Sequence, residues 1–221
     1  MQNRISGRID ARLLNMKRKR LTREQSKDQT RLRLLDAAQA IFMKKGFAAA
    51  SVEDIAEAAG YTRGAFYSNF RSKPELFLEL LRRDHESMQA ELHGIFEENA
   101  TREEMEANVL RYYSRLPRDN KCFLLWVEAK LLAARDARFR VRYNAFQHEK
   151  VEQLTEYINE FSVRVGTPLP LSAETLALGL MGLCDGMQFF FTIDPQNVSV
   201  ERTEEVLGNF FARVVFGRTM G

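Results

Sequence analysis

Apolar residues recur along most of this chain at intervals of three and four positions, and strand-like alternation is almost absent. Recurrence at this spacing is the pattern of an amphipathic helix, whereas alternation at every second position predicts a strand. No internal repeat and no Gly/Ser-rich linker divides the pattern. We therefore expect an all-α protein with about nine helices.

The first third of the chain predicts four helices, each opened by a capping hydroxyl residue. Gly46 can end the first in a left-handed conformation, and Gly60 breaks the short second helix. A Ser or Thr followed three residues later by an acidic or amide residue satisfies free N–H groups at a helix start. The expected caps are Ser26 with Gln29, Ser51 with Asp54, Thr62, and Ser72 with Glu75.

The second and third of these helices predict a helix-turn-helix from Ser51 to Phe70. Two short helices joined by a turn, with a longer helix before them, are the layout that places a second helix in the DNA major groove. The third helix begins Thr62-Arg63-Gly64-Ala65, where small side chains permit close approach to DNA. The Arg63 guanidinium can make paired hydrogen bonds with guanine or bind a phosphate.

The segment from Ser51 to Gly60, SVEDIAEAAG, followed by YTRGAFYSNF and Lys73, resembles the TetR family of bacterial regulators. The resemblance is strong from about Asp28 to Leu81, and beyond it only helical character and length agree. It implies a homodimer that binds a palindromic operator in double-stranded DNA, usually as a repressor. It also implies release when a small molecule enters the C-terminal domain.

The resemblance assigns DNA contacts to particular residues. Bases are read at Thr62, Arg63, Gly64 and Ala65, and phosphate or sugar is touched at Ser51, Tyr67, Ser68 and Lys73. Ile55, Phe66 and Phe70 fall at core positions. Asn69 stands where the family often has His, and an Asn side chain can still donate to a phosphate.

Charge is distributed unevenly along the chain, whose total is only +3. Residues 1–73 hold 16 Lys or Arg against 7 Asp or Glu, a net charge of +9, while residues 74–221 are net acidic. A basic front third favours a polyanionic partner. Residues 1–25 form a basic extension, and two interpretations stay open: an arm in the DNA minor groove, or a disordered tail that raises only non-specific affinity.

The remaining chain predicts five helices and a regulatory and dimerisation domain. We divide the protein into the extension 1–25, the DNA-binding domain 26–72 and the regulatory domain 73–221. The helix from Ser172 carries Gly179, Gly182 and Gly186 close to one face, and both last helices are strongly apolar. Pairing with the same two helices of a second subunit would bury these faces; burial within one monomer is the alternative.

A ligand site is apolar with a few convergent polar groups. The residues that we select for it are Phe123, Trp126, Lys130, Asp185, Gln188 and Phe189. The aromatic content favours a hydrophobic effector, although aromatic residues at helical spacing are more often core. A DNA-binding protein without any ligand, architectural or constitutive, is the alternative.

Other classes of protein find little support in the sequence. No nucleophile elbow, phosphate-binding loop, zinc-protease motif or dinucleotide fingerprint is present, so we expect neither an enzyme nor a metal or cofactor. The two cysteines, Cys122 and Cys184, have no metal-binding spacing and predict reduced thiols in a cytoplasmic protein. The sequence shows no run of about 20 apolar residues, the length that a membrane span needs, so we expect no membrane span.

Overall fold

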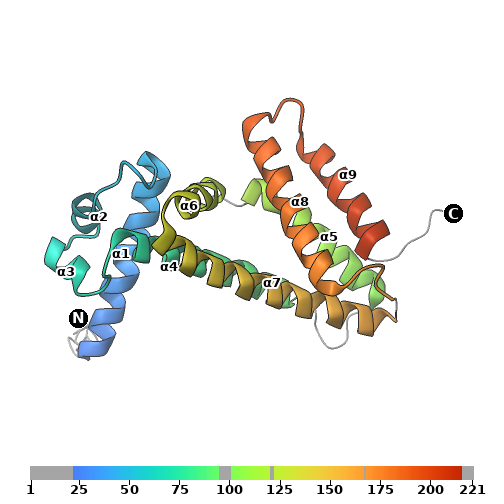
Figure 1. The fold of residues 1–221 in the computed structure, drawn as a ribbon, viewed down its shortest axis with the longest axis horizontal. Helices are drawn as coiled ribbons and strands as arrows, with labels where there is room; N and C mark the ends of the chain where they lie inside the picture. The colour runs from blue at the N-terminus through green and yellow to red at the C-terminus, as the bar shows by residue number, and fades with distance from the viewer. Residues whose placement is uncertain (1–21, 95–100, 120–121, 167, 216–221) are drawn as a thin grey trace, which may run out of the picture.

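The computed structural model describes residues 22–94, 101–119, 122–166 and 168–215. In these ranges the chain forms nine α-helices, a last turn of π-helix and no strand, which confirms the all-α prediction (Figure 1). The helices are α1 (Arg23–Lys45), α2 (Val52–Ala58), α3 (Arg63–Tyr67), α4 (Lys73–His93), α5 (Arg102–Asp119), α6 (Phe123–Arg135), α7 (Ala137–Val165), α8 (Ala173–Ile193) and α9 (Val200–Phe210).

Helix α1 begins one turn earlier than the sequence pattern indicated. The Thr22 hydroxyl accepts from the N–H of Gln25 at 3.1 Å, and the Gln25 side chain accepts from the N–H of Thr22 at 3.0 Å. The predicted cap, Ser26, lies inside the helix, where its carbonyl accepts from the Thr30 hydroxyl. The prediction was wrong because the same pattern of a hydroxyl residue followed by Gln is present four residues upstream.

The remaining caps of the DNA-binding region are confirmed. Ser51 and Asp54 form a reciprocal capping box at α2, with hydrogen bonds of 3.0 and 2.9 Å. Thr62 caps α3 and Ser72 caps α4. Gly60 has a φ of 74° and Gly46 a φ of 79°, but the ψ of Gly46 is 161°, so this residue turns the chain into an extended segment.

The helices divide the molecule into two ends joined by α4 and α7. Figure 1 shows α1, α2 and α3 at one end, α5, α8 and α9 at the other, and the long helices α4 and α7 running between them. Helix α6 packs against α7 and also contacts α1 and α4. Helix α6 is therefore packed between the DNA-binding end and the two connecting helices.

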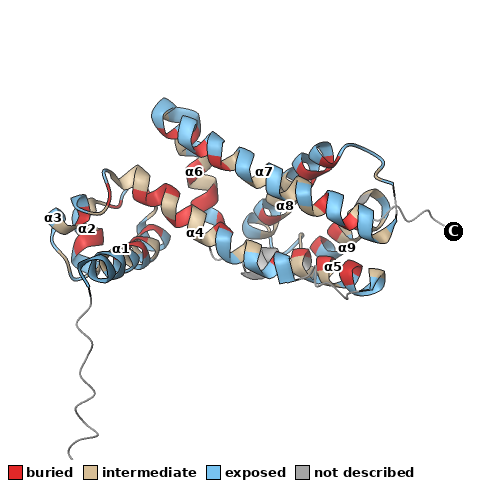
Figure 2. Ribbon diagram, turned by 90° about the horizontal axis from the view of Figure 1, so that it is seen from below, coloured by how far each residue is buried: buried red, intermediate tan, exposed pale blue. Residues whose placement is uncertain are grey.

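The main core is aromatic and continues from the DNA-binding end into α6 and α7. Phe77 of α4 lies at the centre of this cluster, with ring centroids 5.3 Å from Phe42, 4.6 Å from Phe47 and 6.3 Å from Phe139. Figure 2 shows the buried residues of α4 concentrated in its first half, where α1 and α6 pack. The DNA-binding helices are thus held by the rest of the protein through shared aromatic packing.

A second core joins α5, α7, α8 and α9, and it leaves one face of α8 uncovered. Exposed apolar residues on α8 include Leu178, Phe189, Phe190 and Ile193. By length and composition alone, α8 is apolar enough to cross a membrane, contrary to our prediction that no segment would be. A core or interface helix of a soluble protein meets the same criterion, so this is weak evidence for a membrane.

The basic residues of the N-terminal extension up to position 21 lie outside the described residues. The two interpretations of that arm, and the domain boundaries at residues 25 and 72, remain predictions. Because α4 begins at Lys73 and runs to the far end, it belongs structurally to both ends.

Candidate DNA-binding surface and ligand cavity

Helix α3 presents one polar face to solvent and one aromatic face to the core. Phe66 and Phe70 are fully buried, with ring centroids 5.8 Å apart, and they anchor the helix. Thr62, Arg63 and Gly64 are exposed, and Ala65 is partly exposed. The structure therefore places the four residues predicted to read bases on one accessible edge of α3.

The Arg63 side chain forms an ion pair with a carboxylate of α2. Its guanidinium donates to Glu53 of α2 at 2.6 Å and lies 5.5 Å above the ring of Tyr67. Both members of the ion pair are more than half exposed, so the pair adds little to stability. Its effect is to orient Arg63 between α2 and the exposed Tyr67 ring.

The fold of this chain does not require a glycine at position 64. A Cβ atom built there would meet the Thr62 hydroxyl oxygen at 3.7 Å, an ordinary contact, and its φ lies outside the left-handed region. The protein itself therefore tolerates a side chain at this position. A requirement for glycine would have to come from something that approaches α3 from outside.

The side chains of the two residues after α3 donate hydrogen bonds to backbone carbonyls of α3. The Ser68 hydroxyl donates to the Gly64 carbonyl at 2.9 Å, and the Asn69 side chain donates to the Ala65 carbonyl at 2.8 Å. The Oδ1 atom of Asn69 is buried without a partner. Ser68 is exposed, but its single hydroxyl proton goes to the Gly64 carbonyl, so a phosphate contact would have to replace that hydrogen bond. The Asn69 side chain is engaged inside the turn.

Ser51 uses its hydroxyl within the capping box of α2, beside Asp54. The Lys45 ammonium donates to Asp54 at 2.8 Å, and this bond, with the two from Ser51, holds the pKa of Asp54 well below its usual range. The carboxylate is thus ionised and locally paired. A phosphate at Ser51 would share its hydroxyl with the cap.

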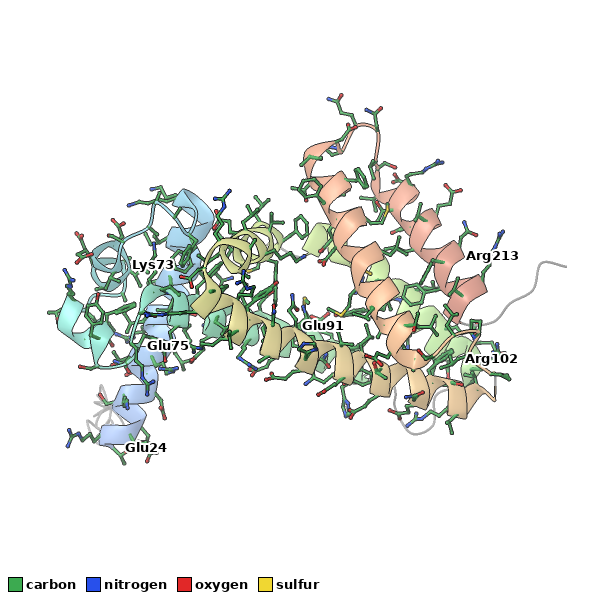
Figure 3. All side chains as sticks on the ribbon, viewed as in Figure 1. Glu24, Lys73, Glu75, Glu91, Arg102 and Arg213 are labelled. Carbon is green, nitrogen blue, oxygen red and sulfur yellow. The ribbon has the colours of Figure 1, made fainter. Side chains whose placement is uncertain are left out.

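Lys73 lies at the start of α4, in the DNA-binding end of the molecule (Figure 3). Its ammonium donates to the carbonyl of Phe47 at 2.7 Å and to that of Ala50 at 2.6 Å, and it sits 4.4 Å from the centroid of the Phe47 ring. Two of its three N–H groups therefore hold the α1–α2 loop. Only one is left for the phosphate contact that the resemblance assigns to it.

Sequence reasoning missed Arg31, which ties three parts of this end together. Its guanidinium pairs with Glu79 of α4, donates to the Asn69 carbonyl at 2.5 Å and lies 4.2 Å from the centroid of the Phe70 ring. It is therefore a positioning residue for the α3–α4 turn. The sequence pattern around Arg31 does not indicate this role, because its partners Asn69 and Glu79 lie 38 and 48 positions further along the chain.

Behind the DNA-binding end, the helices α4–α8 enclose a cavity of about 120 Å³ that opens to solvent. A cavity of this order accommodates a single aromatic ring. Five of the six predicted ligand residues line it: Phe123, Trp126, Lys130, Asp185 and Gln188. Phe189 does not; it lies on the uncovered face of α8, because one residue further along a helix rotates the side chain by about 100°.

Several polar residues of the cavity were missed by sequence reasoning. His85 of α4 and Gln147 and Lys150 of α7 line the cavity, and Nδ1 of His85 and Oε1 of Gln147 are buried without a partner. Desolvation lowers the pKa of His85, so the ring is neutral at physiological pH. Gln147 and Lys150 lie on α7, whose sequence predicts an amphipathic helix with a charged outer face. No pattern in the neighbouring sequence shows which polar residues of this helix point inward.

Asp185 and Gln188 line the cavity from α8, and each interacts with other groups of the protein. Asp185 accepts a hydrogen bond from the Lys130 ammonium at 2.7 Å, so the two predicted charged ligand residues neutralise each other. Gln188 is buried and has an interaction partner of its own within the protein. Among the described residues, no three His, Cys, Asp or Glu side chains gather as metal ligands.

The middle of α4 connects the cavity to the DNA-binding end through four successive residues. Arg82 pairs with Glu149 of α7, Arg83 pairs with Asp36 of α1, and Asp84 accepts from the indole N–H of Trp126 at 2.7 Å. His85 follows on the cavity wall, 3.0 Å from Gln153. One turn of α4 therefore contacts both the cavity and α1.

A second connection runs through α6. Glu128 accepts from the backbone N–H of Phe47 at 2.6 Å, so α6 is bonded to the α1–α2 loop that Lys73 also holds. Trp126 and Lys130 of the same helix line the cavity. A displacement of α6 would thus be transmitted directly to the start of the helix-turn-helix.

Two family profiles match the chain. The profile described as "Bacterial regulatory proteins, tetR family" matches residues 34–80, and the one described as "BetI-type transcriptional repressor, C-terminal" matches residues 101–215. The first contains the helix-turn-helix and the second contains most of the cavity wall. Together they cover both ends of the molecule.

The match to a curated relative covers part of the chain. The HTH-type transcriptional regulator TtgR of Pseudomonas putida is 44% identical over 68 residues, 31% of this chain and 32% of TtgR. The chain thus matches about a third of the length of such relatives. The names of these relatives therefore assign no effector and no regulated gene to this chain.

Solved structures agree over most of the fold. A putative transcriptional regulator of Saccharomonospora viridis in complex with choline has a TM-score of 0.67 at 20% identity, covering 83% of this chain and 96% of its own. SmeT in complex with triclosan, where SmeT is the repressor of the Stenotrophomonas maltophilia multidrug efflux pump SmeDEF, has a TM-score of 0.65 at 20% identity, covering 83% and 90%. These structures show that the fold is shared. The two family profiles, in agreement with the helix-turn-helix geometry, establish that the chain belongs to the TetR family of bacterial transcriptional regulators.

Proposed function

We propose that this protein is a cytoplasmic, sequence-specific repressor that binds a palindromic operator as a homodimer and is released by a small ligand. The observation that carries the DNA-binding part is the exposed edge of α3, with Thr62, Arg63 and Gly64 accessible above the buried Phe66 and Phe70. This edge has the small and cationic side chains that base readout needs. The residues that we propose for DNA contact are Ser51, Thr62, Arg63, Gly64, Ala65, Tyr67, Ser68, Asn69 and Lys73.

The uncovered face of α8 supports dimerisation through α8 and α9. Leu178, Gly182, Phe189 and Ile193 fall on one side of α8, and the three apolar side chains are 55%, 43% and 59% exposed. A Cβ built at Gly182 meets nothing within 4 Å, so a second helix has room to approach closely. A copy of the same chain would bury this stripe against its own. It would also set two recognition helices about one DNA turn, roughly 34 Å, apart.

A matched pair of variants tests the dimer. Gly182→Arg places a long charged side chain in the proposed interface without a clash inside the monomer, so we expect a monomer by sedimentation velocity and loss of operator binding. Val163→Arg, at an 82% exposed site on α7, is the control and should stay dimeric. A dimeric Gly182→Arg variant would place the interface elsewhere.

Ligand release is supported by the two connections between cavity and DNA-binding end. A ligand shifts the population toward a state that it binds better. Here the shift would act on α4, through Arg83 and Asp84, and on α6, through Glu128. Either movement changes the spacing of the two recognition helices. The C-terminal family profile, named for a repressor, supports repression.

The rival interpretation is a DNA-binding protein that responds to no ligand. Selection of genomic fragments with the full-length protein at about physiological salt tests the DNA-binding part of the proposal. We expect a palindrome to be enriched, and the neighbouring genes then show whether the site overlaps a promoter as repression requires. Recovery of no common sequence would contradict the proposal and favour an architectural protein.

A further inference from the structure

Lys150 is a cationic side chain on the cavity wall that lacks a polar partner. Its ammonium lies 4.2 Å from the centroid of the Trp126 ring and 5.9 Å from that of Phe146. Within the described ranges it makes no hydrogen bond or ion pair, although Lys130, on the same wall, is paired with Asp185. An ammonium that is largely removed from water without a hydrogen bond to a carboxylate is costly.

The formal charge of the cavity wall is therefore positive. Among the described residues that line it, Lys130 and Asp185 cancel, His85 is neutral, and Lys150 remains. The Asp84 carboxylate acts on Lys150 from α4, but it does not line the cavity and accepts from the Trp126 indole. Gln147, one turn before Lys150 on α7, also lines the cavity and has an amide atom without a partner. Its Nε2 lies 2.6 Å from the Tyr143 hydroxyl, and rotating the amide by 180° would let that hydroxyl donate to Oε1 and free Nε2 to donate.

The rest of the wall is apolar and aromatic. Trp126, Tyr112 and Phe123 contribute rings, and Met88, Leu92, Leu154, Leu180 and Met181 contribute aliphatic side chains. Such a lining holds a flat hydrophobic group, and the volume of about 120 Å³ limits it to about one ring. Lys150 and Gln147 offer donors at one side.

We propose that the effector is a small aromatic anion, such as an aryl carboxylate, whose negative group is bound by Lys150 and Gln147. The proposal rests on the ligand-released function above and adds its ligand class. A quaternary ammonium, the group that choline carries in the solved Saccharomonospora viridis neighbour, would meet an unpaired cation here. This chain should therefore discriminate against cations although the fold is shared.

Trp126 gives a direct readout, because it is the single tryptophan of the chain. Its fluorescence in the full-length protein, without DNA, is titrated with benzoate, benzamide and phenyltrimethylammonium, which have one ring and differ in charge. We expect benzoate to bind about ten-fold more tightly than benzamide, as charge-assisted hydrogen bonds are stronger than neutral ones, and phenyltrimethylammonium to bind most weakly. Equal binding of the three probes, preference for the cation, or no binding of benzoate would overturn the proposal.

Variants assign the preference to Lys150. Lys150→Met keeps the apolar stem over Trp126 and should remove the preference for benzoate, whereas Lys150→Arg keeps the charge and should retain it. Lys44→Met, at an exposed site on α1, controls for the loss of one positive charge. Retention of the benzoate preference in Lys150→Met would contradict the assignment.

The wild-type protein provides a test that does not depend on a variant folding. Desolvation lowers the pKa of Lys150 to about 8, and a bound carboxylate favours the protonated form. At pH 8 about half of the lysine is neutral, so benzoate binding should take up about half a proton, and benzamide binding none. Calorimetry in two buffers of different ionisation enthalpy measures this uptake. Absence of uptake with benzoate would count against Lys150 as the anion partner.

Other groups near Lys150 do not produce the same signal. Burial lowers the pKa of His85 and raises the pKa values of Tyr112, Tyr113 and Cys184, so none of these four changes charge near pH 8. The groups that face Lys150 are Asp84 and His85 of α4, Tyr112 and Tyr113 of α5, Lys130 of α6, Tyr143 of α7, and Cys184 and Asp185 of α8.

Operator binding then separates this proposal from the proposed function. If benzoate binds through Lys150 but does not weaken operator binding, the ligand class is supported and ligand release fails. If only neutral or cationic compounds release the operator and benzoate does not bind, ligand release is supported and the ligand class is overturned.

Discussion

The two ends of the molecule differ in how completely they satisfy their own polar and apolar groups. At the DNA-binding end, Lys73 and Arg31 donate to backbone carbonyls, and Phe77 is enclosed by other aromatic rings. At the other end, Lys150 lacks a polar partner in the described structure and the apolar stripe of α8 is open. Among the described residues of the DNA-binding end, Oδ1 of Asn69 is the one buried side-chain polar atom without a partner. The other end keeps a lysine and an apolar face that a bound molecule would cover.

This difference separates structural from functional roles among charged residues. Lys73 and Arg31 belong to the basic front third, yet both are engaged inside the scaffold. Arg63 alone among these three has its guanidinium on the exposed edge of α3. Net charge therefore indicates a polyanionic partner, and exposure together with hydrogen bonding indicates which cations can reach it.

The largest effect is expected from the aromatic core that links the two ends. Phe77→Ala removes a fully buried ring between Phe42, Phe47 and Phe139 and leaves a cavity, so it should lower the free energy of unfolding by about 3–5 kcal/mol. Urea denaturation measures this change. The control is Phe190→Ala, at an exposed position of α8, measured at low protein concentration. An equal loss of unfolding free energy in both variants would contradict the distinction between the enclosed aromatic core and the open face of α8.

A smaller loss is expected when the α1–α2 loop is released. Lys73→Met removes two charge-assisted hydrogen bonds to the Phe47 and Ala50 carbonyls and should lower the free energy of unfolding by about 1.5–3 kcal/mol. If Lys73 served only a phosphate, the variant would instead keep wild-type stability and lose DNA affinity alone. Denaturation and DNA titration of the same preparation distinguish the two outcomes.

Arg63→Ala should change DNA binding and leave stability alone. Its ion pair with Glu53 is exposed, so the free energy of unfolding should stay within about 0.5 kcal/mol of the wild type. Operator binding should weaken by about 1–3 kcal/mol with relaxed preference at one base pair. Equal weakening on operator and scrambled DNA, measured by fluorescence anisotropy, would make Arg63 a phosphate contact.

A small effect on stability, of the opposite sign to that of Phe77→Ala and Lys73→Met, is expected at Gly64. Gly64→Ala removes backbone freedom from the unfolded chain at a site with room for a methyl group, so the free energy of unfolding should rise by about 0.5–1 kcal/mol. Operator binding should nevertheless weaken, because the added methyl group separates α3 from the DNA. Unchanged affinity would exclude close approach at this position.

Local patterns predicted the DNA-binding end well. The caps at Ser51, Thr62 and Ser72 and the inward positions of Phe66 and Phe70 are all confirmed, since each depends on residues within one or two helical turns. The start of α1 was wrong by one turn because two equivalent capping patterns follow each other. Choosing between them requires knowledge of the contacts that the first turn makes.

The cavity was predicted less completely, because it is made of residues distant in sequence. Five of the six ligand residues selected from aromatic and polar content line it, while Phe189 lies on the outer face of α8. His85 and Lys150 were missed because each sits in a charged stretch that reads as a solvated helix face. Their inward positions follow from the crossing of α4 and α7, which no local pattern encodes.

Competition between the recovered operator and scrambled DNA at about physiological salt is the decisive measurement. A dimeric repressor that reads bases with α3 should bind the operator at least about a thousand-fold more tightly than scrambled DNA. Benzoate should reduce that ratio if the cavity controls the spacing of the recognition helices. A ratio near one without any ligand would show that the protein holds DNA only by charge, and would contradict its assignment as a sequence-specific repressor.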